Sequence, residues 1–258
     1  ALVRLYILYP DVVVSKGGYT SVPVILAAAF LRIPILIHES DTQPGRANRL
    51  ASRFTEHVAI SFEEARSQFP RHDVYFTGIP LRKELLIEEQ RVRKEGDLPT
   101  LLVLGGSQGA LRINELILDS LDELLPRYRI VHQTGKEHFT ITKETALKLI
   151  RDDTMTERYI PIPFWDDATL LHHAYRDADL VISRAGTGTI YEIAAHGKPG
   201  ILIPIPETIS HDQRTNAYAY ARRGAASVLE EANLSDSLLT SEISRIMDDP
   251  ALYAHMCE

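Results

Sequence analysis

The chain has 258 residues, with 28 Lys and Arg against 35 Asp and Glu, and therefore a formal net charge of −7. At 45% hydrophobic and 24% charged residues its composition is that of an ordinary globular protein, which excludes disorder, collagen-like repeats and a coiled coil. Its one cysteine, Cys257, excludes an internal disulfide framework and a multi-cysteine zinc site, and its acidic balance argues against nucleic acid as a partner.

Short β-branched runs alternate with longer amphipathic stretches from residue 10 onward, a pattern typical of βαβ units on a parallel sheet. Before it, the apolar segment 2–9 has two open interpretations, a membrane-facing patch or a buried helix. The strands expected next are residues 11–15, 33–38, 57–61 and 73–76, with helices at 22–31 and 45–54.

The charged segment 83–97 (KELLIEEQRVRKEGD) carries no strand signal, so we place a linker at residues 83–99, between a first domain of residues 1–82 and a second of residues 100–258. Six strand and helix pairs follow, with strands at 100–104, 129–133, 158–162, 179–183, 200–204 and 226–229. Right-handed crossovers wind such units into an open, doubly wound sheet. The sequence predicts an α/β protein of two Rossmann-like domains with a cleft between them, the first domain being incomplete.

Glycine-rich loops follow three of the expected strands, at residues 16–20, 105–110 and 184–189. Such loops favour phosphate, because N–H groups and the helix dipole face a ligand there and glycine lets the backbone approach it. Each loop alone is more simply a tight turn, but three together indicate a phosphorylated ligand. None matches the P-loop or the G-x-G-x-x-G dinucleotide spacing, so the ATPase and dehydrogenase interpretations fall.

Three polar residues of the second domain are candidates for ligand contacts. Glu192 lies four residues past Gly188 on an otherwise apolar helix, where its carboxylate either accepts two ribose hydroxyls or caps the helix N-terminus. Gln213 and Asn216 share one face of a later helix, for which Asp212 is the expected N-cap.

Two further groups are interpreted as structural. Asp177 and Asp179 have the spacing of the metal pair of some sugar transferases, but they lead into a strand, so we expect no metal site there. His172 and His173 lie in mid-helix without other ligands nearby, and we expect them on the surface.

Six motifs in a fixed order carry a resemblance. They are PDVVVSKGGY at 10–19, His38-Glu39, G-x-P-x-R at 78–82, GGSQGA at 105–110, EIAA at 192–195 and H-x-Q-x-x-N-A at 211–217. Together they closely resemble the MurG family, the N-acetylglucosaminyltransferases of glycosyltransferase family 28 that convert lipid I to lipid II in peptidoglycan synthesis. The resemblance covers essentially the whole chain.

The resemblance implies an inverting GT-B glycosyltransferase whose second domain holds UDP-GlcNAc, with no cofactor or metal required. It assigns the diphosphate to the glycine loops, the ribose to Glu192, uracil to backbone groups at Phe164 and Trp165, and the sugar to Gln213. The residues implied for UDP-GlcNAc binding are Asp41, Arg82, Ser107, Gln108, Trp165, Gly186, Thr187, Gly188, Thr189, Ile190, Tyr191, Glu192, Gln213 and Asn216. The implied partners are UDP-GlcNAc, undecaprenyl-linked lipid I and the cytoplasmic face of the cell membrane, where the protein would be peripheral.

The sequence departs from the family pattern in two places. Ser40 and Asp41 stand where the family has Gln-Asn, and Asp41 can accept a hydrogen bond from the sugar but cannot donate one. The family's first glycine-rich loop, G-G-T-G-G-H, which carries the proposed general base, has no counterpart, so about a third of the family's chain is expected to be missing. We therefore assign no base, expect donor binding without turnover, and take His38 as the first suspect if the chain proves active.

Two other functions stay open. One is a related glycolipid synthase that adds a sugar to diacylglycerol, which the GGSQGA loop and the H-x-Q-x-x-N-A motif disfavour. The other is a donor-binding module that is inactive without a partner chain or the missing segment, which the absent loop suggests.

Overall fold

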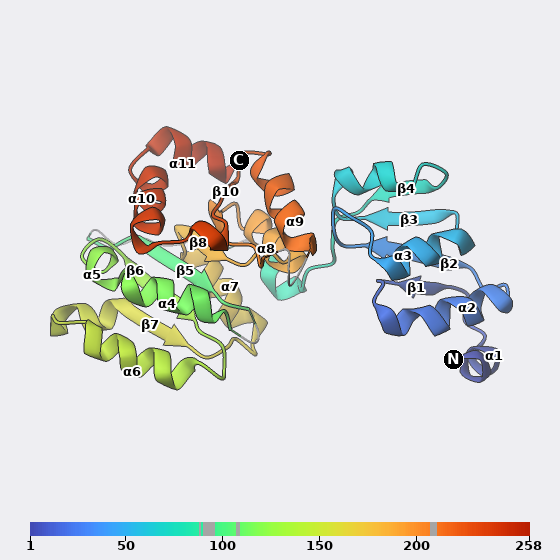
Figure 1. The fold of residues 1–258 in the computed structure, drawn as a ribbon, viewed down its shortest axis with the longest axis horizontal. Helices are drawn as coiled ribbons and strands as arrows, with labels where there is room; N and C mark the ends of the chain where they lie inside the picture. The colour runs from blue at the N-terminus through green and yellow to red at the C-terminus, as the bar shows by residue number, and fades with distance from the viewer. Residues whose placement is uncertain (88, 90–95, 107–108, 207–210) are drawn as a thin grey trace. The chain divides into compact units, whose positions relative to one another are not determined.

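The computed structural model describes residues 1–87, 89, 96–106, 109–206 and 211–258, with backbone only at 211 and 212. Over these residues the chain divides into two compact units, Ala1–Pro80 and Leu81–Glu258, and each has its own parallel sheet (Figure 1). The α/β class with two parallel-sheet domains, predicted from the sequence, is confirmed.

The first unit carries four parallel strands in the order β1-β2-β3-β4. The strands are β1 (Val13–Ser15), β2 (Ile35–Glu39), β3 (His57–Ile60) and β4 (Asp73–Phe76). The helices are α1 (Leu2–Leu8), α2 (Val22–Phe30) and α3 (Arg46–Ala51), with 3-10 turns at η1 (Tyr19–Ser21), η2 (Ser52–Phe54) and η3 (Glu63–Gln68). Ile25 of α2 packs with Ile37 and Val58 of the two middle strands, and all three are fully buried. Their burial holds the first sheet to its helices.

Helix α1 is mostly exposed. Leu5 joins the core of the first unit, whereas Val3, Ile7 and Leu8 are 71%, 73% and 72% exposed. The interpretation as a buried helix therefore holds for Leu5 alone, and α1 presents an apolar outer surface. Among the described residues, no helix has the length and apolar character needed to cross a bilayer.

The second unit carries six parallel strands in the order β10-β9-β8-β5-β6-β7. The strands are β5 (Thr100–Leu104), β6 (Arg129–Gln133), β7 (Tyr159–Ile162), β8 (Leu180–Ser183), β9 (Gly200–Leu202) and β10 (Ala226–Val228). The helices are α4 (Leu111–Asp119), α5 (Leu121–Leu124), α6 (Phe139–Leu149), α7 (Ala168–Asp177), α8 (Thr187–Ala195), α9 (His211–Ala221), α10 (Asp236–Met247) and α11 (Pro250–Cys257). The 3-10 turns are η4 (Lys83–Leu86), η5 (Asp153–Arg158) and η6 (Glu231–Asn233).

The strand order of this sheet reverses between β5 and β8. From β5 the chain runs outward through β6 to β7, then returns to β8 and runs outward through β9 to β10. Right-handed crossovers place α4 and α6 on one face of the sheet and α8 and α9 on the other. In open parallel sheets, ligands bind beyond the carboxyl ends of the strands at such a reversal. The fold therefore places a binding crevice after Leu104 and Ser183.

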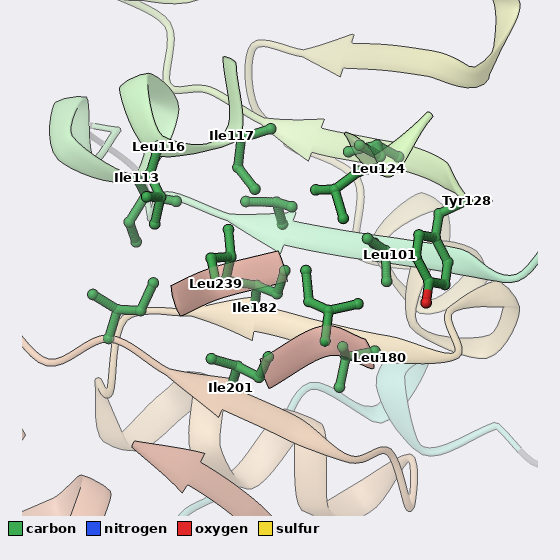
Figure 2. Packing of buried hydrophobic residues seen from close by; sticks show 14 of the residues in the cluster. Leu101, Ile113, Leu116, Ile117, Leu124, Tyr128, Leu180, Ile182, Ile201 and Leu239 are labelled. Carbon is green, nitrogen blue, oxygen red and sulfur yellow. The ribbon is translucent and has the colours of Figure 1, made fainter. Parts of the chain in front are cut away.

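A continuous apolar core supports one face of this sheet. Figure 2 shows Leu101, Leu180, Ile182 and Ile201 on three neighbouring strands together with Leu239 of α10, and each of these side chains is 0% exposed. Burying one such side chain contributes roughly 1.5–3 kcal/mol. The strand ends that carry the glycine loops are therefore held by a rigid base.

Most predicted strands coincide with observed ones, but the strand expected at residues 200–204 ends at Leu202. The N–H of Ile203 still donates to the carbonyl of Ser183 at 2.8 Å. Pro204 has no N–H, so the ladder cannot continue past it.

The start of the predicted linker is anchored on the second unit. Turn η4 packs against α7 and α8, and Leu85 is only 2% exposed. Arg82 immediately precedes this turn and is therefore carried by the same unit. The rest of the expected linker includes residues 88 and 90–95, which lie outside the described residues.

Candidate functional site

A pocket of about 190 Å³ opens at the carboxyl ends of β5 and β6, beside the reversal of strand order. It is lined by Arg82, Leu104, Gly106, Gln133, Phe164, Trp165, Leu171, Thr189 and Glu192. All of these residues belong to the second unit. Of the residues predicted to bind UDP-GlcNAc, the structure thus brings together Arg82, Trp165, Thr189 and Glu192.

The glycine loop after β5 is shaped by close backbone packing. A Cβ on Gly105 would come within 2.9 Å of the Gln133 carbonyl oxygen, and one on Gly109 would collide with the Thr134 carbonyl oxygen. Gly109 also has a positive φ of 84°, which favours glycine. The exposed Gly106 lines the pocket, whereas the predicted ligand residues 107 and 108 (Ser107 and Gln108) lie outside the described residues.

The first turn of α8 reaches the site through Thr189, which lines the pocket. The helix begins after Gly186, and no described side chain caps it. The first N–H groups of a helix have no partner within the helix and carry a positive partial charge, which suits an anion. A Cβ on Gly186 or Gly188 would meet no described atom within 4 Å, so packing there does not require glycine. These two glycines leave room for a ligand to approach the backbone.

Glu192 projects from α8 past its first turn and lines the pocket. Its Oε2 accepts a hydrogen bond from the Tyr175 hydroxyl at 2.9 Å. Burial raises the pKa of Glu192, and the Tyr175 bond and the charge of Arg82 offset part of that rise. Because the carboxylate bonds a tyrosine of α7 rather than N–H groups of the first helical turn, the interpretation as a helix cap is wrong.

The segment after β7 supplies aromatic walls. Trp165 is 8% exposed, and Phe164 beside it is half-buried. Lys136 Nζ lies 5.2 Å from the centroid of the Phe164 ring and 3.1 Å from a carboxylate oxygen of Asp166. Phe164 and Trp165 both line the pocket, so this segment lies directly beside it.

Of the other predicted residues of α8 and α9, some are buried in the interior and others are partly exposed. Ile190 is 2% exposed, so its side chain packs in the interior, while Tyr191 is half-buried. Asn216 is fully buried and donates to Thr187 Oγ1 at 3.3 Å, which ties α9 to the start of α8. Gln213 accepts the N–H of Ile205 at 3.3 Å.

The predicted N-cap of α9 cannot be compared, because the side chain of Asp212 lies outside the described residues.

Sequence reasoning missed two polar residues at the site. Gln133 lines the pocket at the end of β6 and donates from Nε2 to the Gly106 carbonyl at 3.0 Å, which fixes the glycine loop. The signal was present, since a polar residue ending a strand beside the reversal faces the crevice. Tyr175, which holds Glu192, sits within an amphipathic helix and carries no comparable signal.

His38 and Asp41 both belong to the first unit. His38 is the penultimate residue of β2, and Asp41 lies in the loop that follows this strand. The N–H of Asp41 donates to Glu39 Oε1 at 3.1 Å, and Glu39 also accepts from Asn48 Nδ2 at 2.8 Å. His38 Nε2 lies 2.8 Å from the Gly78 carbonyl, so Nε2 carries the proton and Nδ1 is the basic nitrogen. That Nδ1 is buried and has no described partner.

The prediction that His172 lies on the surface of its helix, α7, is wrong. His172 is 1% exposed rather than on the surface, because its Nδ1 meets His196 Nε2 at 3.2 Å between α7 and α8. His173 beside it is partly exposed.

The two aspartates near β8 have structural partners. Asp177 pairs with Arg176 at 2.8 Å, and Asp179 accepts the N–H of Thr100 at 2.7 Å. Within the part of the chain that the structure describes, no group of three or more His, Cys, Asp or Glu is arranged to hold a metal ion.

Fold and site together define a Rossmann-type unit with a pocket beside its strand reversal. The family description "Glycosyltransferase family 28 C-terminal domain" matches residues 100–258, and "Glycosyltransferase family 28 N-terminal domain" matches residues 4–60. The chain belongs to glycosyltransferase family 28, and the resemblance inferred from its motifs is confirmed.

Curated relatives are similar over nearly the whole chain. The UDP-N-acetylglucosamine–N-acetylmuramyl-(pentapeptide) pyrophosphoryl-undecaprenol N-acetylglucosamine transferase of Shouchella clausii is 41% identical over 95% of this chain and 67% of its own length. The protein of the same name from Geobacter sulfurreducens is 40% identical over 94% of this chain and 66% of its own length. The crystal structure of Acinetobacter baumannii MurG matches with a TM-score of 0.80 and 27% identity, covering 99% of this chain and 70% of that one. The chain thus spans about two thirds of the length of its relatives.

Proposed function

We propose that the second unit binds UDP-GlcNAc in the pocket at its strand reversal. We further propose that the protein transfers GlcNAc to undecaprenyl-linked lipid I, which gives lipid II in peptidoglycan synthesis. The observation that carries the proposal is that Glu192 lines one pocket together with Thr189, which lies in the first turn of α8, a helix whose N-terminus has no side-chain cap. A carboxylate accepts ribose hydroxyls, and a helix N-terminus accepts phosphate. The names of the relatives supply the sugar and the acceptor.

The remaining implied residues take roles consistent with their positions. Arg82 and the glycine loops contact the diphosphate, backbone groups at Trp165 contact uracil, and Gln213 contacts the sugar. Asn216 and Ile190 support α8 from behind, since both side chains are buried. Asp41 remains a proposed donor contact from the first unit.

The proposed reaction inverts the configuration at the anomeric carbon of the transferred sugar. The 4-hydroxyl of the acceptor sugar attacks that carbon and gives up its proton to a base, the bond to the diphosphate breaks, and UDP leaves with the negative charge. N–H groups at a helix N-terminus and a nearby guanidinium stabilise such charge without a bound cation. The start of α8 and Arg82 supply these groups, so we propose that no cofactor or metal is required. We assign no general base in this chain.

The lipid tail of the acceptor places the reaction at the cytoplasmic face of the cell membrane, where we propose that the protein is peripheral. The apolar outer surface of α1 supports contact with such a surface. The glycolipid synthase remains a weaker alternative, because the relatives are named for an undecaprenol-linked acceptor.

Calorimetry tests the donor site directly. UDP-GlcNAc and UDP are both expected to bind the chain, and the affinity of each should be the same with and without EDTA. Glu192→Ala should weaken binding about ten- to a hundredfold, because a buried acceptor of two hydroxyl hydrogen bonds is lost.

Glu242→Ala is the matched control for that measurement. Glu242 is a largely buried carboxylate paired with Arg245 at 2.7 Å and is not among the pocket residues, so its loss should lower stability without changing UDP affinity. Absence of UDP binding, or binding that EDTA abolishes, would contradict the proposal.

A further inference from the structure

Behind Glu192 lies a cluster of three side chains, two of them buried and the third half-buried, that the proposed function does not use. Tyr175 of α7 is 0% exposed and donates its hydroxyl to Glu192 Oε2 at 2.9 Å. Its ring stacks on that of His196, with centroids 4.7 Å apart and an interplanar angle of 18°. His172, which is 1% exposed, meets His196 at 3.2 Å. The cluster therefore reaches from the interior of α7 to the carboxylate at the pocket.

The hydrogen bonds of this cluster run in one direction. His196 Nδ1 lies 2.7 Å from the Glu192 carbonyl oxygen, which can only accept, so Nδ1 carries the proton and Nε2 is an acceptor. His172 Nδ1 must then donate to His196 Nε2. Burial lowers the pKa of His196, in agreement with a neutral ring. His172 thus donates to His196, and His196 donates to the Glu192 carbonyl oxygen. These two hydrogen bonds connect α7 to α8.

The tyrosine controls which way the carboxylate faces. A glutamate has three rotatable side-chain bonds, and the positive charge of Arg82 in the same pocket offers its carboxylate a competing partner. The Tyr175 hydroxyl holds Oε2 on the side of α7. The hydrogen bond leaves Oε1 and a second lone pair of Oε2 as acceptors for a ligand in the pocket.

We propose that Tyr175 is a positioning residue for donor recognition, which presents the Glu192 carboxylate to the ribose hydroxyls and is itself held by the stacked ring of His196. The inference rests on the proposed role of Glu192 in donor binding. It predicts that losing the tyrosine hydroxyl weakens recognition of the ribose specifically, beyond any general loss of stability.

Calorimetry with UDP and 2′-deoxy-UDP tests this inference. The wild type should prefer UDP about tenfold, since one hydroxyl hydrogen bond to a charged group is lost with the deoxy ligand. Tyr175→Phe should bring that ratio close to one. His196→Ala removes the stacked ring from a half-buried position and should lower the ratio by a smaller factor. In the Glu192→Ala background, Tyr175→Phe should have no further effect on UDP affinity.

Tyr159→Phe is the matched control. Tyr159 is also buried and also donates its hydroxyl to one partner, His132 Nδ1 at 2.9 Å, but it is not among the pocket residues. Its loss should lower the melting temperature as Tyr175→Phe does and leave the ratio of the two ligands unchanged.

The outcomes separate the inference from the function on which it rests. If the wild type prefers UDP and both Tyr175→Phe and His196→Ala keep the full preference, the positioning role is wrong while donor binding stands. If the wild type binds UDP without any preference over the deoxy ligand, the ribose contact of Glu192 fails, and the role of Tyr175 fails with it. A preference lost in Tyr175→Phe and kept in Tyr159→Phe supports the inference.

Discussion

Glu192 is a buried carboxylate whose proposed role in ligand binding comes at a cost to the stability of the fold. Burial raises its pKa above the ordinary value near 4.5, so the ionised form that would bind a ribose opposes folding at neutral pH. The Tyr175 bond and the charge of Arg82 reduce this cost without removing it. A residue whose ionised form opposes folding, in a pocket at a strand reversal, is a candidate for function rather than stability.

Glu192→Gln is accordingly expected to stabilise the chain at neutral pH. Near pH 4 the wild-type carboxyl is largely protonated in both folded and unfolded states, so the melting temperatures should be similar. As the pH rises through the raised folded pKa, the wild type loses stability and the variant does not. Gln keeps an oxygen acceptor for the Tyr175 hydroxyl. Melting temperatures measured between pH 4 and 7 should therefore diverge in favour of the variant.

Glu230→Gln provides a control of opposite sign. The bonds from Tyr218 and Arg214 lower the pKa of Glu230, so its charge supports folding above the unfolded pKa. This variant should be less stable than the wild type near pH 7, and the difference should shrink as the pH falls. A Glu192→Gln variant that is less stable than the wild type at pH 7 would overturn the argument.

At the scale of elements, His132 joins two strands and a helix. It lies on β6, where its Nδ1 is 2.9 Å from the Tyr159 hydroxyl of β7 and its Nε2 is 3.0 Å from Asn114 Oδ1 of α4. Asn114 in turn donates to the Thr134 carbonyl at 2.9 Å, just beyond the end of β6. The neutral ring satisfies both neighbours, and complete burial lowers the pKa of His132 to about 3.

This network predicts sensitivity to mild acid. The unfolded chain binds a proton at this histidine below a pKa of about 6.5, whereas folded His132 stays neutral until about pH 3. The stability of the fold therefore falls progressively as the pH drops from about 6.5 towards 3. Replacing His132 with Gln should lower stability at pH 7 and flatten the decline between pH 6 and 4, as measured by urea unfolding. His255→Gln removes an exposed histidine and should leave the slope unchanged. An unchanged slope in the His132 variant would disprove this role.

The sequence predicted elements well where one local pattern decides them. Residues 101–104 (LLVL) are a continuous apolar run, as is typical of a strand covered on both faces, and every residue of β5 is buried. The glycine loop after β5 and the carboxylate on α8 were predicted for the same reason, because each depends on neighbours within a few positions. Local patterns do not reveal which distant side chains meet. His172 bonds a histidine 24 residues away, and Tyr175 bonds a glutamate 17 residues away.

At the scale of the whole molecule, the pocket is complete within one unit. Every described residue that lines it lies after Leu81, and the apolar cluster beneath it belongs to the same unit. A polypeptide of residues 81–258 is therefore expected to fold alone and to bind UDP within about threefold of the affinity of the whole chain. Calorimetry on the two polypeptides makes the comparison. Folding without UDP binding would mean that the first unit supplies an essential donor contact.

The same shorter polypeptide offers an internal check. Glu192→Ala should weaken UDP binding by the same factor in residues 81–258 as in the whole chain, since the contacts of Glu192 lie within the second unit. A different factor would show that residues 1–80 influence the ribose contact.

The glycines of the second unit differ in whether the packing around them requires glycine. Gly105 is dictated by the backbone, because any larger residue would overlap the Gln133 carbonyl oxygen. Gly188 is not, since a Cβ there meets no described atom within 4 Å and its helix would gain about 0.5–1 kcal/mol from alanine. A designer given this backbone and no knowledge of a ligand would write alanine at that position. Packing against the described residues does not explain Gly188, whereas the proposed donor site does, because a residue without a side chain lets a ligand approach the backbone.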